Sequence, residues 1–542
     1  MTPLDTWPRT HYELLQHYHA QYDEGIRTGQ FRPFVYPWGT LGIIPVIIYL
    51  LIPHRKGSWL SKCRFVAWLW IVAIATHLIK DTRAKNMAPT FGLGLISAWV
   101  VIWTLAILVC NDAQTDFQRI ERMEGAFKKN VKEKDQSNGN AETNQEVRND
   151  SSAFNSATVH HEHLGPGSRH GEFAWQPFPL EPFVERLDWV LDIFCNFRGM
   201  GWNWRISSIP PAPKWVQTQL ARNSPNPPQH SNKTHPGQSH VYPTRRALLL
   251  ANLKTALQGY LTLDLLKTLT NHDPYFWGLV DRAPPPYFPF SLLHNHPILL
   301  KLFHLTVSQY IIKSSLETLF SLAPLFFSGL LGPSLLGARA EPWMYPETWG
   351  SYYTVFDRGL AGWWASWWHQ TFRFAFEEPS RKIIEVLNMN RRSAGAKALQ
   401  LVLAFGLSGF LHACGSYTQW GPSRPLRGPM AYFLSQAVGI FLEGYVTGIL
   451  HRVGIQRRVE RNVPKWARRG FTFAYVHFWF YHTSPLLCDD FARGGIWLYE
   501  PIPVSLFRGL GLGVEGDGWW CWGGEWGKWH SAEKWWKSGF AL

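Results

Sequence analysis

Long apolar runs separated by short basic turns are the feature that most constrains how this chain can fold. The runs cover residues 34–53, 63–79, 89–110, 297–336, 398–417, 430–450 and 471–487. A helix needs about 20 predominantly apolar residues to cross a hydrocarbon core of roughly 30 Å. We therefore predict an all-α, polytopic integral membrane protein with about seven to nine transmembrane helices. The run at 297–336 fits either one long tilted helix or a tight pair.

The composition supports a membrane location and argues against nucleic-acid binding. Thirty of the 542 residues are Trp, which favours membrane interfaces because its apolar ring can keep its N–H in water. The net charge is +14, and Lys and Arg cluster in short loops such as 381–397 and 451–469, which the positive-inside rule places in the cytosol. The six cysteines form no CxxC pair, so we expect neither a disulfide framework nor a zinc site, and no bound metal.

Changes in composition divide the chain into four predicted segments. Residues 1–110 would hold N-terminal membrane helices, and 245–490 would form the main membrane core. Residues 111–244 are largely polar and should be a disordered loop, except for an amphipathic island at 173–204 that we expect on the membrane surface. Within that island Leu187, Val190, Leu191 and Phe194 are expected to share one apolar stripe. Residues 491–542 form a Trp-rich tail that we expect at the interface.

His412 lies inside the apolar, glycine-spaced run at 398–417. An ionisable side chain in a bilayer is costly, so it is a functional-site hypothesis by default. Two interpretations remain open. The histidine either bonds to a helix carbonyl as a structural group, or it acts as a general base that takes a proton from an attacking alcohol. Gly406, Gly409 and Gly415 would let a helix or a ligand approach closely.

His369 lies in a Trp-rich segment, residues 363–373. A histidine at a membrane interface is unremarkable on its own. Arg358 and Arg373 nevertheless place hydrogen-bond donors near His369, where they could orient a carbonyl oxygen or a coenzyme A phosphate. Trp364 and Trp368 would line the same site.

Four segments together resemble one known family. Pro346-Glu-Thr-Trp349-Gly350, Trp364-Ala-Ser-Trp-Trp-His369-Gln-Thr-Phe-Arg373 and Leu407-Ser-Gly-Phe-Leu-His412 resemble motifs of wax synthase-like proteins, which belong to the membrane-bound O-acyltransferase superfamily. Asn196-Phe-Arg198-Gly-Met-Gly-Trp-Asn-Trp204, with Arg186-Leu-Asp-Trp189 before it, resembles a segment of fungal members. The resemblance covers about residues 180 to 490. Ser366 and Trp367 stand where the family commonly has a basic pair.

The resemblance implies a polytopic acyltransferase in which acyl-CoA enters from the cytosolic side. His412 would be the general base and His369 its polar partner, while Trp364, Trp368, Arg373, Ser408 and Arg358 would bind substrate. Fungal members often acetylate terpenoid, meroterpenoid or related alcohols, so acetyl-CoA is the expected donor, with no bound cofactor. The endoplasmic reticulum is the expected location. The alternatives are a long-chain acyl-CoA:alcohol transferase making wax or sterol esters, and a non-catalytic transporter or structural protein.

Other histidines and charged residues also suggest functional or structural roles. His477 and His482 could line a pocket or simply be satisfied core histidines, and Glu443 could pair with either one. Lys313 and Glu317 lie four residues apart and could pair on one helix face. His160-His-Glu-His163 resembles a metal-binding tract, and residues 149–151 and 232–234 are glycosylation sequons.

Overall fold

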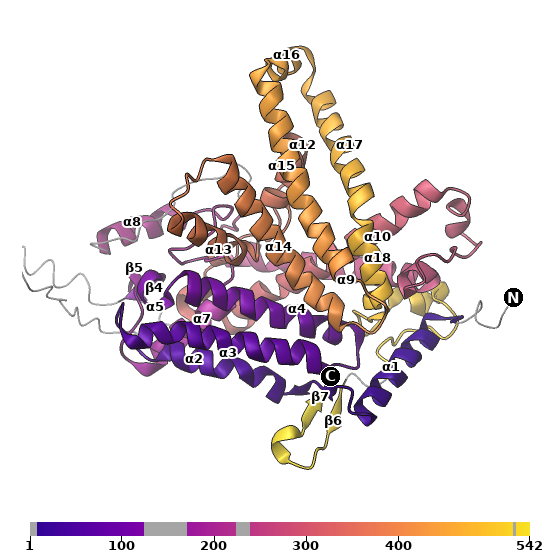
Figure 1. Cartoon of the computed structure of the whole chain (residues 1–542), viewed down its shortest axis with the longest axis horizontal. Helices are drawn as coiled ribbons and strands as arrows, with labels where there is room; N and C mark the ends of the chain where they lie inside the picture. The colour runs from indigo at the N-terminus through magenta and orange to yellow at the C-terminus, as the bar shows by residue number, and fades with distance from the viewer. Residues whose placement is uncertain (1–7, 124–170, 224–238, 524–526) are drawn as a thin grey trace, which may run out of the picture. The chain divides into compact units, whose positions relative to one another are not determined.

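The computed structural model describes residues 8–123, 171–223, 239–523 and 527–542. The chain forms two compact units. One contains Met1–Ala113, Leu253–Ser321 and Thr348–Leu542, and the other contains Gln114–Asn252 and Leu322–Glu347. Helices dominate both units (Figure 1). The predicted all-α, multipass fold is confirmed by five helical stretches that are long and apolar enough to cross a membrane. They are Trp59–Asp81, Met87–Cys110, Pro297–Ala340, Ala394–Thr418 and Leu426–Arg452.

The first unit carries most of the long helices. Its regular helices are α1 (His11–Arg27), α2 (Ile44–Leu51), α3 (Trp59–Asp81), α4 (Met87–Thr104), α12 (Tyr353–Gly362), α13 (Arg373–Val386), α14 (Ala394–Thr418), α15 (Ala431–Arg452), α16 (Ile455–Asn462), α17 (Lys465–Thr483) and α18 (Pro485–Gly494). Its 3-10 and π helices are η2 (Trp38–Ile43), η3 (Leu105–Cys110), η4 (Pro274–Trp277), η5 (Phe290–Leu292), η9 (Trp363–Trp367), η10 (Leu426–Met430), η11 (Ile496–Leu498), η12 (Arg508–Leu512) and η13 (Trp535–Lys537). Helices α9 (Arg245–His272) and α10 (Pro297–Pro324) run from one unit into the other.

The predicted span at 34–53 is shorter in the structure. Only Trp38–Leu51 is helical, as η2 followed by α2. Pro37 stands just before this stretch, and Gly39 and Gly42 weaken its first turns. A total of seven to nine crossings therefore needs further helices, and α9 and α17 are long enough, with 28 and 19 residues.

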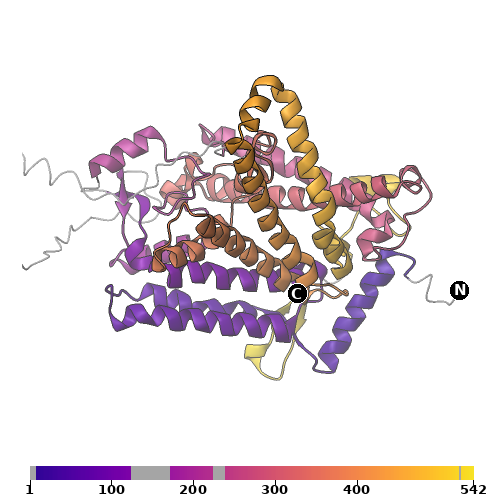
Figure 2. The ribbon, with the colours of Figure 1, turned by 45° about the horizontal axis from the view of Figure 1, so that its top comes forward.

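Helices α4 and α14 pack backbone to backbone and lie side by side (Figure 2). A Cβ atom on Gly94 would lie 2.0 Å from the Cys414 carbonyl oxygen, so only glycine permits this approach. Thr90 and Thr418 each donate a hydroxyl hydrogen bond to the other's carbonyl oxygen, at 2.8 and 2.6 Å. Small residues and interhelical hydrogen bonds are how helices associate where water is absent. This contact holds the C-terminal half of α14, which carries His412.

Short strands tie the two ends of the first unit together. Strand β2 (Val35–Tyr36) pairs antiparallel with β7 (Gly539–Ala541), which also pairs with β6 (Lys528–His530). Strand β1 (Arg32–Pro33) pairs with β3 (Thr82–Arg83) in parallel.

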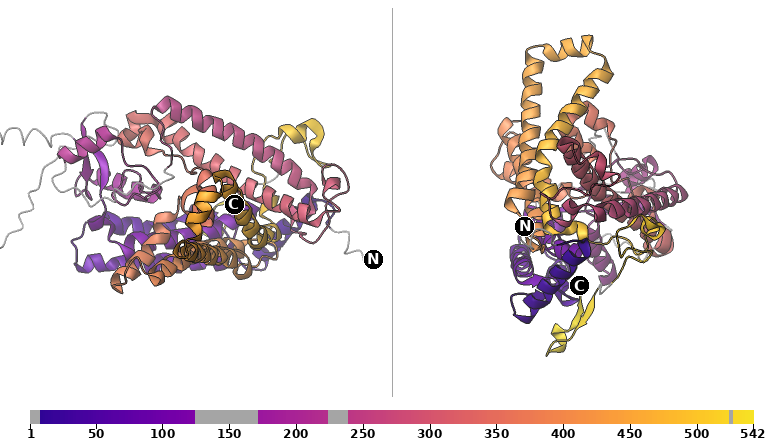
Figure 3. Two further views of the ribbon diagram at one scale, coloured as in Figure 1. Left: turned by 90° about the horizontal axis from the view of Figure 1, so that it is seen from above. Right: turned by 90° about the vertical axis from the view of Figure 1, so that its right-hand side faces the viewer.

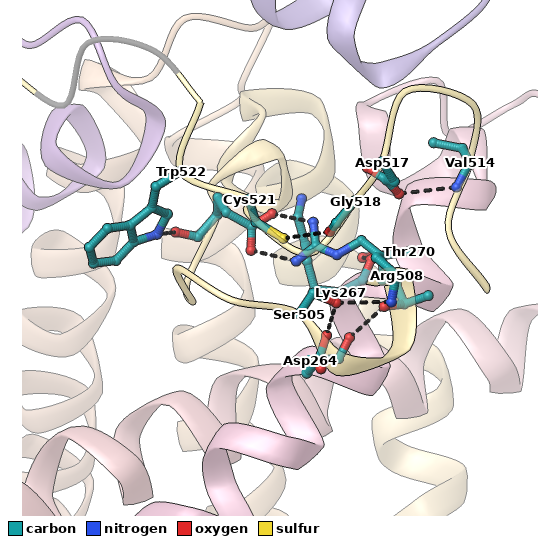
Figure 4. Close-up of polar contacts among 12 residues, drawn as sticks. Asp264, Lys267, Thr270, Ser505, Arg508, Val514, Asp517, Gly518, Cys521 and Trp522 are labelled. Carbon is teal, nitrogen blue, oxygen red and sulfur yellow. Dashed lines mark hydrogen bonds and ion pairs between the residues drawn. The ribbon is translucent and has the colours of Figure 1, made fainter. Parts of the chain in front are cut away.

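The polar face of α9 receives the C-terminal segment (Figure 4). Asp264 is fully buried and accepts hydrogen bonds from the Ser505 hydroxyl and from the backbone N–H groups of Leu506 and Phe507. Lys267 donates to the Trp497 carbonyl oxygen at 2.7 Å. Leucines at positions 253, 257, 261 and 265 of the same helix are exposed. A helix that is polar toward protein and apolar outward suits a lipid environment, which makes α9 a candidate for a further crossing.

In the second unit, part of the segment that the sequence predicts to be a disordered loop forms helices and strands. The elements of this unit are β4 (Arg119–Met123), β5 (Glu172–Gln176), α7 (Phe183–Cys195), α8 (Lys214–Asn223), η6 (Leu325–Leu331), α11 (Gly332–Leu336), η7 (Gly337–Ala340) and η8 (Pro342–Met344). Strands β4 and β5 pair antiparallel over five residues. Residues 124–170 and 224–238 lie outside the described residues, and the His160–His163 tract and both sequons fall within them.

The island at 173–204 is packed into the second unit, and its buried stripe differs from the predicted one. Trp189, Val190 and Ile193 are fully buried, whereas Leu191 is 45% exposed. The reason is tertiary, because Trp202 from the following turn packs edge to face on Trp189, with ring centroids 5.0 Å apart. Buried ion pairs support the same region, since Arg119 contacts Asp188 at 2.7 Å and Asp192 at 3.3 Å.

Glu185 should make the stability of this protein depend on pH. Burial raises the pKa of its carboxyl group from 4.5 to about 7, with Arg119 opposing the shift. Because the pKa is higher in the folded state, the folded protein holds this proton more tightly than the unfolded chain does. The resulting contribution to stability is fully present below about pH 4.5 and is lost as the pH rises through about 7. Glu185→Gln keeps the acceptor for the Gln176 amide without the charge. We expect its gain in unfolding temperature over the wild type to grow between about pH 5 and about pH 8. A constant difference across that range would contradict the burial argument.

Candidate active site

The Trp-rich segment forms a short π helix, η9, that ends immediately before Trp368. Gln370 closes this end, because its side-chain amide donates to the carbonyl oxygens of Trp364 and Trp368 at 2.8 and 2.6 Å. Arg373 donates to the Ala365 carbonyl and to the Gln370 amide oxygen, both at 3.1 Å. The break in the helix leaves His369 on an irregular stretch between η9 and α13.

Gly350 allows the preceding turn to lie directly on η9. A Cβ atom at this position would come within 1.9 Å of the Ser366 carbonyl oxygen, and the Gly350 N–H donates to the Trp367 carbonyl at 3.0 Å. Trp349 is thereby placed against Trp368 and His369, with ring centroids 4.8 and 5.7 Å away. The Pro346–Gly350 motif therefore serves the fold by building one wall around His369.

Aromatic rings surround His369. Phe320, Trp349, Trp368 and Phe372 all have ring centroids between 5.4 and 5.9 Å from the imidazole. The segment therefore packs on the interior of the protein, and its expected place at the membrane interface stays a prediction. Trp363 is 7% exposed and joins the main apolar cluster, on which Trp364, Trp367 and Trp368 also pack.

His412 is held in one tautomer by its own helix. Its Nδ1 lies 2.8 Å from the Ser408 carbonyl oxygen. A carbonyl oxygen can only accept a hydrogen bond, so Nδ1 carries the proton and the neutral ring keeps its lone pair on Nε2. The imidazole therefore bonds to a helix carbonyl, as the first interpretation expects, and its role as a general base stays a prediction.

The two histidines belong to one continuous aromatic assembly. The His412 ring lies 4.5 Å from that of Phe433, which lies 5.9 Å from that of Trp364. Trp364 then leads to Trp368 at 5.9 Å, and Trp368 to His369 at 5.4 Å. Three rings, those of Phe433, Trp364 and Trp368, therefore link the imidazoles along this route, and the role of the two Trp rings toward substrate stays a prediction.

The two arginines predicted to bind substrate both make hydrogen bonds within the protein. The Arg373 guanidinium donates hydrogen bonds to the backbone of η9 and to the Glu377 carboxylate, which lies 2.6 Å from Nε. Arg358 donates to the Ser366 hydroxyl at 3.2 Å from an exposed position on α12. Their role toward coenzyme A stays a prediction, as does that of Ser408, whose carbonyl orients His412.

Glu443 supports the site in a way that the sequence did not reveal. Its carboxylate accepts from the N–H groups of Leu360 and Ala361 at 3.0 and 2.9 Å, and from the Tyr475 hydroxyl at 2.5 Å. Gly359 stands at this break in α12 with φ of +58°, and a Cβ there would lie 1.8 Å from the carboxylate. The suggested pairing of Glu443 with His477 or His482 is therefore replaced by this cap.

The remaining histidine predictions have simple outcomes. His477 lies 2.8 Å from the Phe473 carbonyl oxygen and 3.3 Å from the Tyr352 hydroxyl, so it is a satisfied histidine. Lys313 and Glu317 form the predicted ion pair, at 2.5 Å. Among the residues that the structure describes, no group of three or more His, Cys, Asp or Glu side chains could hold a metal ion.

A buried acid–histidine pair was missed by the sequence analysis. His304 on α10 lies 2.8 Å from the carboxylate of Asp273, which is fully buried. Tyr275 stacks on the His304 ring at 3.9 Å and donates its hydroxyl to Asp489 at 2.8 Å. These residues come from three separate segments, so no spacing in the sequence could have brought them together. Tyr275 belongs to the same apolar cluster as Phe433 and Trp363.

Comparison with known proteins gives a consistent result. The model of the "Membrane bound O-acyl transferase family" matches residues 345–435, the stretch that contains both His369 and His412. The chain is 24% identical to "O-Mevalon transferase yanI" of Aspergillus niger over 55% of its length and 61% of the relative. It is 24% identical to "Acetyltransferase ple2" of Rhodocybe pseudopiperita over 60% of this chain and 73% of that one. It is also 25% identical to "Acetyltransferase pyr8" of Aspergillus fumigatus, over 62% and 71% respectively. The chain thus spans less than two thirds of the first relative, and no solved structure matches it.

Proposed function

We propose, from the match of residues 345–435 to the membrane bound O-acyl transferase family, that this chain transfers an acetyl group from acetyl-CoA to a hydroxyl of a terpenoid, meroterpenoid or similar secondary metabolite. The observation that carries the proposal is the fixed tautomer of His412, whose basic Nε2 belongs to a half-buried aromatic assembly shared with His369. The names of the relatives support the acetyl donor, since two of the three are called acetyltransferases.

The proposed reaction needs one base and one site for the thioester. His412 Nε2 takes the proton of the acceptor hydroxyl as its oxygen attacks the thioester carbonyl carbon. The carbon–sulfur bond then breaks, and His412 returns the proton to the coenzyme A sulfur. His369 orients the thioester, and Trp364 and Trp368 provide flat apolar walls for the acyl group and the acceptor. The apolar surroundings strengthen each of these electrostatic contacts. We place the enzyme in the endoplasmic reticulum membrane.

The proposal is tested by acyl transfer in membranes that contain the full chain. Labelled acetyl-CoA or palmitoyl-CoA is supplied with a pool of terpenoid and fatty alcohols, and esters are separated by chromatography. Acetyl ester formation is expected. Palmitoyl transfer alone would reassign the chain to wax or sterol ester synthesis. If no ester forms with either donor, binding of labelled acyl-CoA to the purified chain is measured, and absence of binding would favour a non-catalytic membrane protein.

His369→Ala should reduce acyl transfer by roughly 10- to 100-fold, a smaller loss than removal of the base. The positioning role predicts that part of the loss appears as a raised KM for acyl-CoA, because the thioester is held less well. His369→Asn keeps a side-chain donor and should recover part of the activity. The control variant is His482→Ala, which removes an exposed histidine on α17 and should leave both kcat and KM unchanged. A pure loss of kcat in His369→Ala would contradict a role in binding.

A further inference from the structure

Helices α15 and α17 run side by side, and α16 closes their far end (Figure 3). We refer to residues 451–469, which include α16, as the tip of this hairpin. Every described residue of α16 is exposed or half-exposed. Gly454, with φ of +74°, makes the sharp corner between α15 and α16. The tip is therefore a folded helical turn whose residues lie outside the protein interior.

The tip has a strongly unbalanced charge. It contains seven Arg and Lys residues, at positions 452, 457, 458, 461, 465, 468 and 469, against one acidic residue, Glu460. One of these cations, Arg469, pairs with Asp357 at 2.7 Å. Glu460 accepts a hydrogen bond from the neutral Gln456 amide at 2.9 Å. Arg457, Arg458 and Arg461 are exposed on α16 itself.

The same helix has an apolar side. Ile455 and Val459 are one helical turn apart, 44% and 39% exposed, and they face away from the three arginines of α16. Trp466, 77% exposed, follows at the start of α17. A short helix with exposed apolar residues on one side, arginines on the other and a neighbouring Trp is the pattern of a helix lying in a membrane interface.

We propose that the tip binds the headgroups of anionic phospholipids, with Arg457, Arg458 and Arg461 contacting phosphate or carboxylate groups while Ile455 and Val459 enter the acyl-chain boundary. Charge complementarity selects this partner, because basic segments beside a membrane helix are attracted to an anionic leaflet. The hairpin connects the tip to the candidate site, since α15 carries Phe433 and Glu443 and α17 carries Tyr475. Binding of lipid would set the depth at which these helices lie in the bilayer.

The test measures which lipids the purified full chain retains. The protein is exchanged into detergent micelles that contain equal amounts of phosphatidylcholine and phosphatidylserine, passed through gel filtration, and its bound lipids are quantified by mass spectrometry. The wild type should retain phosphatidylserine in roughly threefold or greater excess. The triple variant Arg457→Gln, Arg458→Gln, Arg461→Gln should lose this excess, and added salt should weaken it in the wild type.

Matched variants distinguish lipid binding by the tip from lipid binding by positive charge elsewhere on the chain. Arg391→Gln, Arg392→Gln, Lys397→Gln removes three exposed charges from another basic loop, and it should keep most of the excess. The substitution of Arg457, Arg458 and Arg461 by Lys should also keep it. Equal retention in the wild type and the Gln variant of the tip would overturn the proposal, as would equal losses from both loops. Displacement of the bound lipid by free coenzyme A would show that the tip prefers nucleotide phosphates and would equally overturn it.

Discussion

His412→Ala should reduce acyl transfer by about 10²–10⁴-fold while the protein remains folded. In the proposed mechanism Nε2 takes the hydroxyl proton, because the Nδ1–H bond to the Ser408 carbonyl leaves Nε2 as the basic atom of this ring. Alanine removes the base but leaves the helix backbone and its packing on α4 unchanged. The measurement is the initial rate of ester formation from labelled acyl-CoA, at saturating and limiting concentrations of both substrates.

The matched control for this prediction is His482→Ala, which removes an exposed histidine that packs on Phe478 and Tyr481. Its rate should equal that of the wild type. His412→Gln provides a second comparison, since glutamine can donate a hydrogen bond but cannot take the hydroxyl proton, so it should be as inactive as alanine. Equal rates in the wild type and His412→Ala would remove His412 from the mechanism.

Glu443→Ala should lower the free energy of unfolding by about 3–5 kcal/mol and also reduce activity. Its carboxylate satisfies the N–H groups of Leu360 and Ala361 and the Tyr475 hydroxyl, and each of these three hydrogen bonds contributes about 1–1.5 kcal/mol. Without it, the break in α12 loses its cap, and η9, which follows directly in the chain, is no longer fixed. The measurement is thermal unfolding of the detergent-solubilised chain, followed by tryptophan fluorescence.

Tyr475→Phe is the graded control, because it deletes one of the three donors and should cost roughly a third to a half as much. Gly359→Ala should resemble Glu443→Ala, since its Cβ would collide with the carboxylate at a positive φ. An unchanged unfolding temperature in Glu443→Ala would show that the carboxylate does not hold the break.

The sequence by itself determined the membrane character and most of the long helices. The predicted runs at 63–79, 89–110, 398–417 and 430–450 lie inside the observed spans Trp59–Asp81, Met87–Cys110, Ala394–Thr418 and Leu426–Arg452. This succeeds because the hydrocarbon core imposes a length and a polarity on each helix separately, so the information is local. The motif around His369 and His412 is local in the same sense, and the family match to residues 345–435 covers both.

Only the tertiary structure decided how the candidate site is supported. The tautomer of His412 depends on a carbonyl one turn away, but its neighbour Phe433, the cap from Glu443 and the pair of Asp273 with His304 come from distant segments. The buried side of α7 likewise includes Trp189, which packs on Trp202, and it differs from the predicted apolar stripe. Hydrophobic periodicity says that one face of a helix is buried, whereas the packing partner decides which face it is and which polar groups are satisfied there.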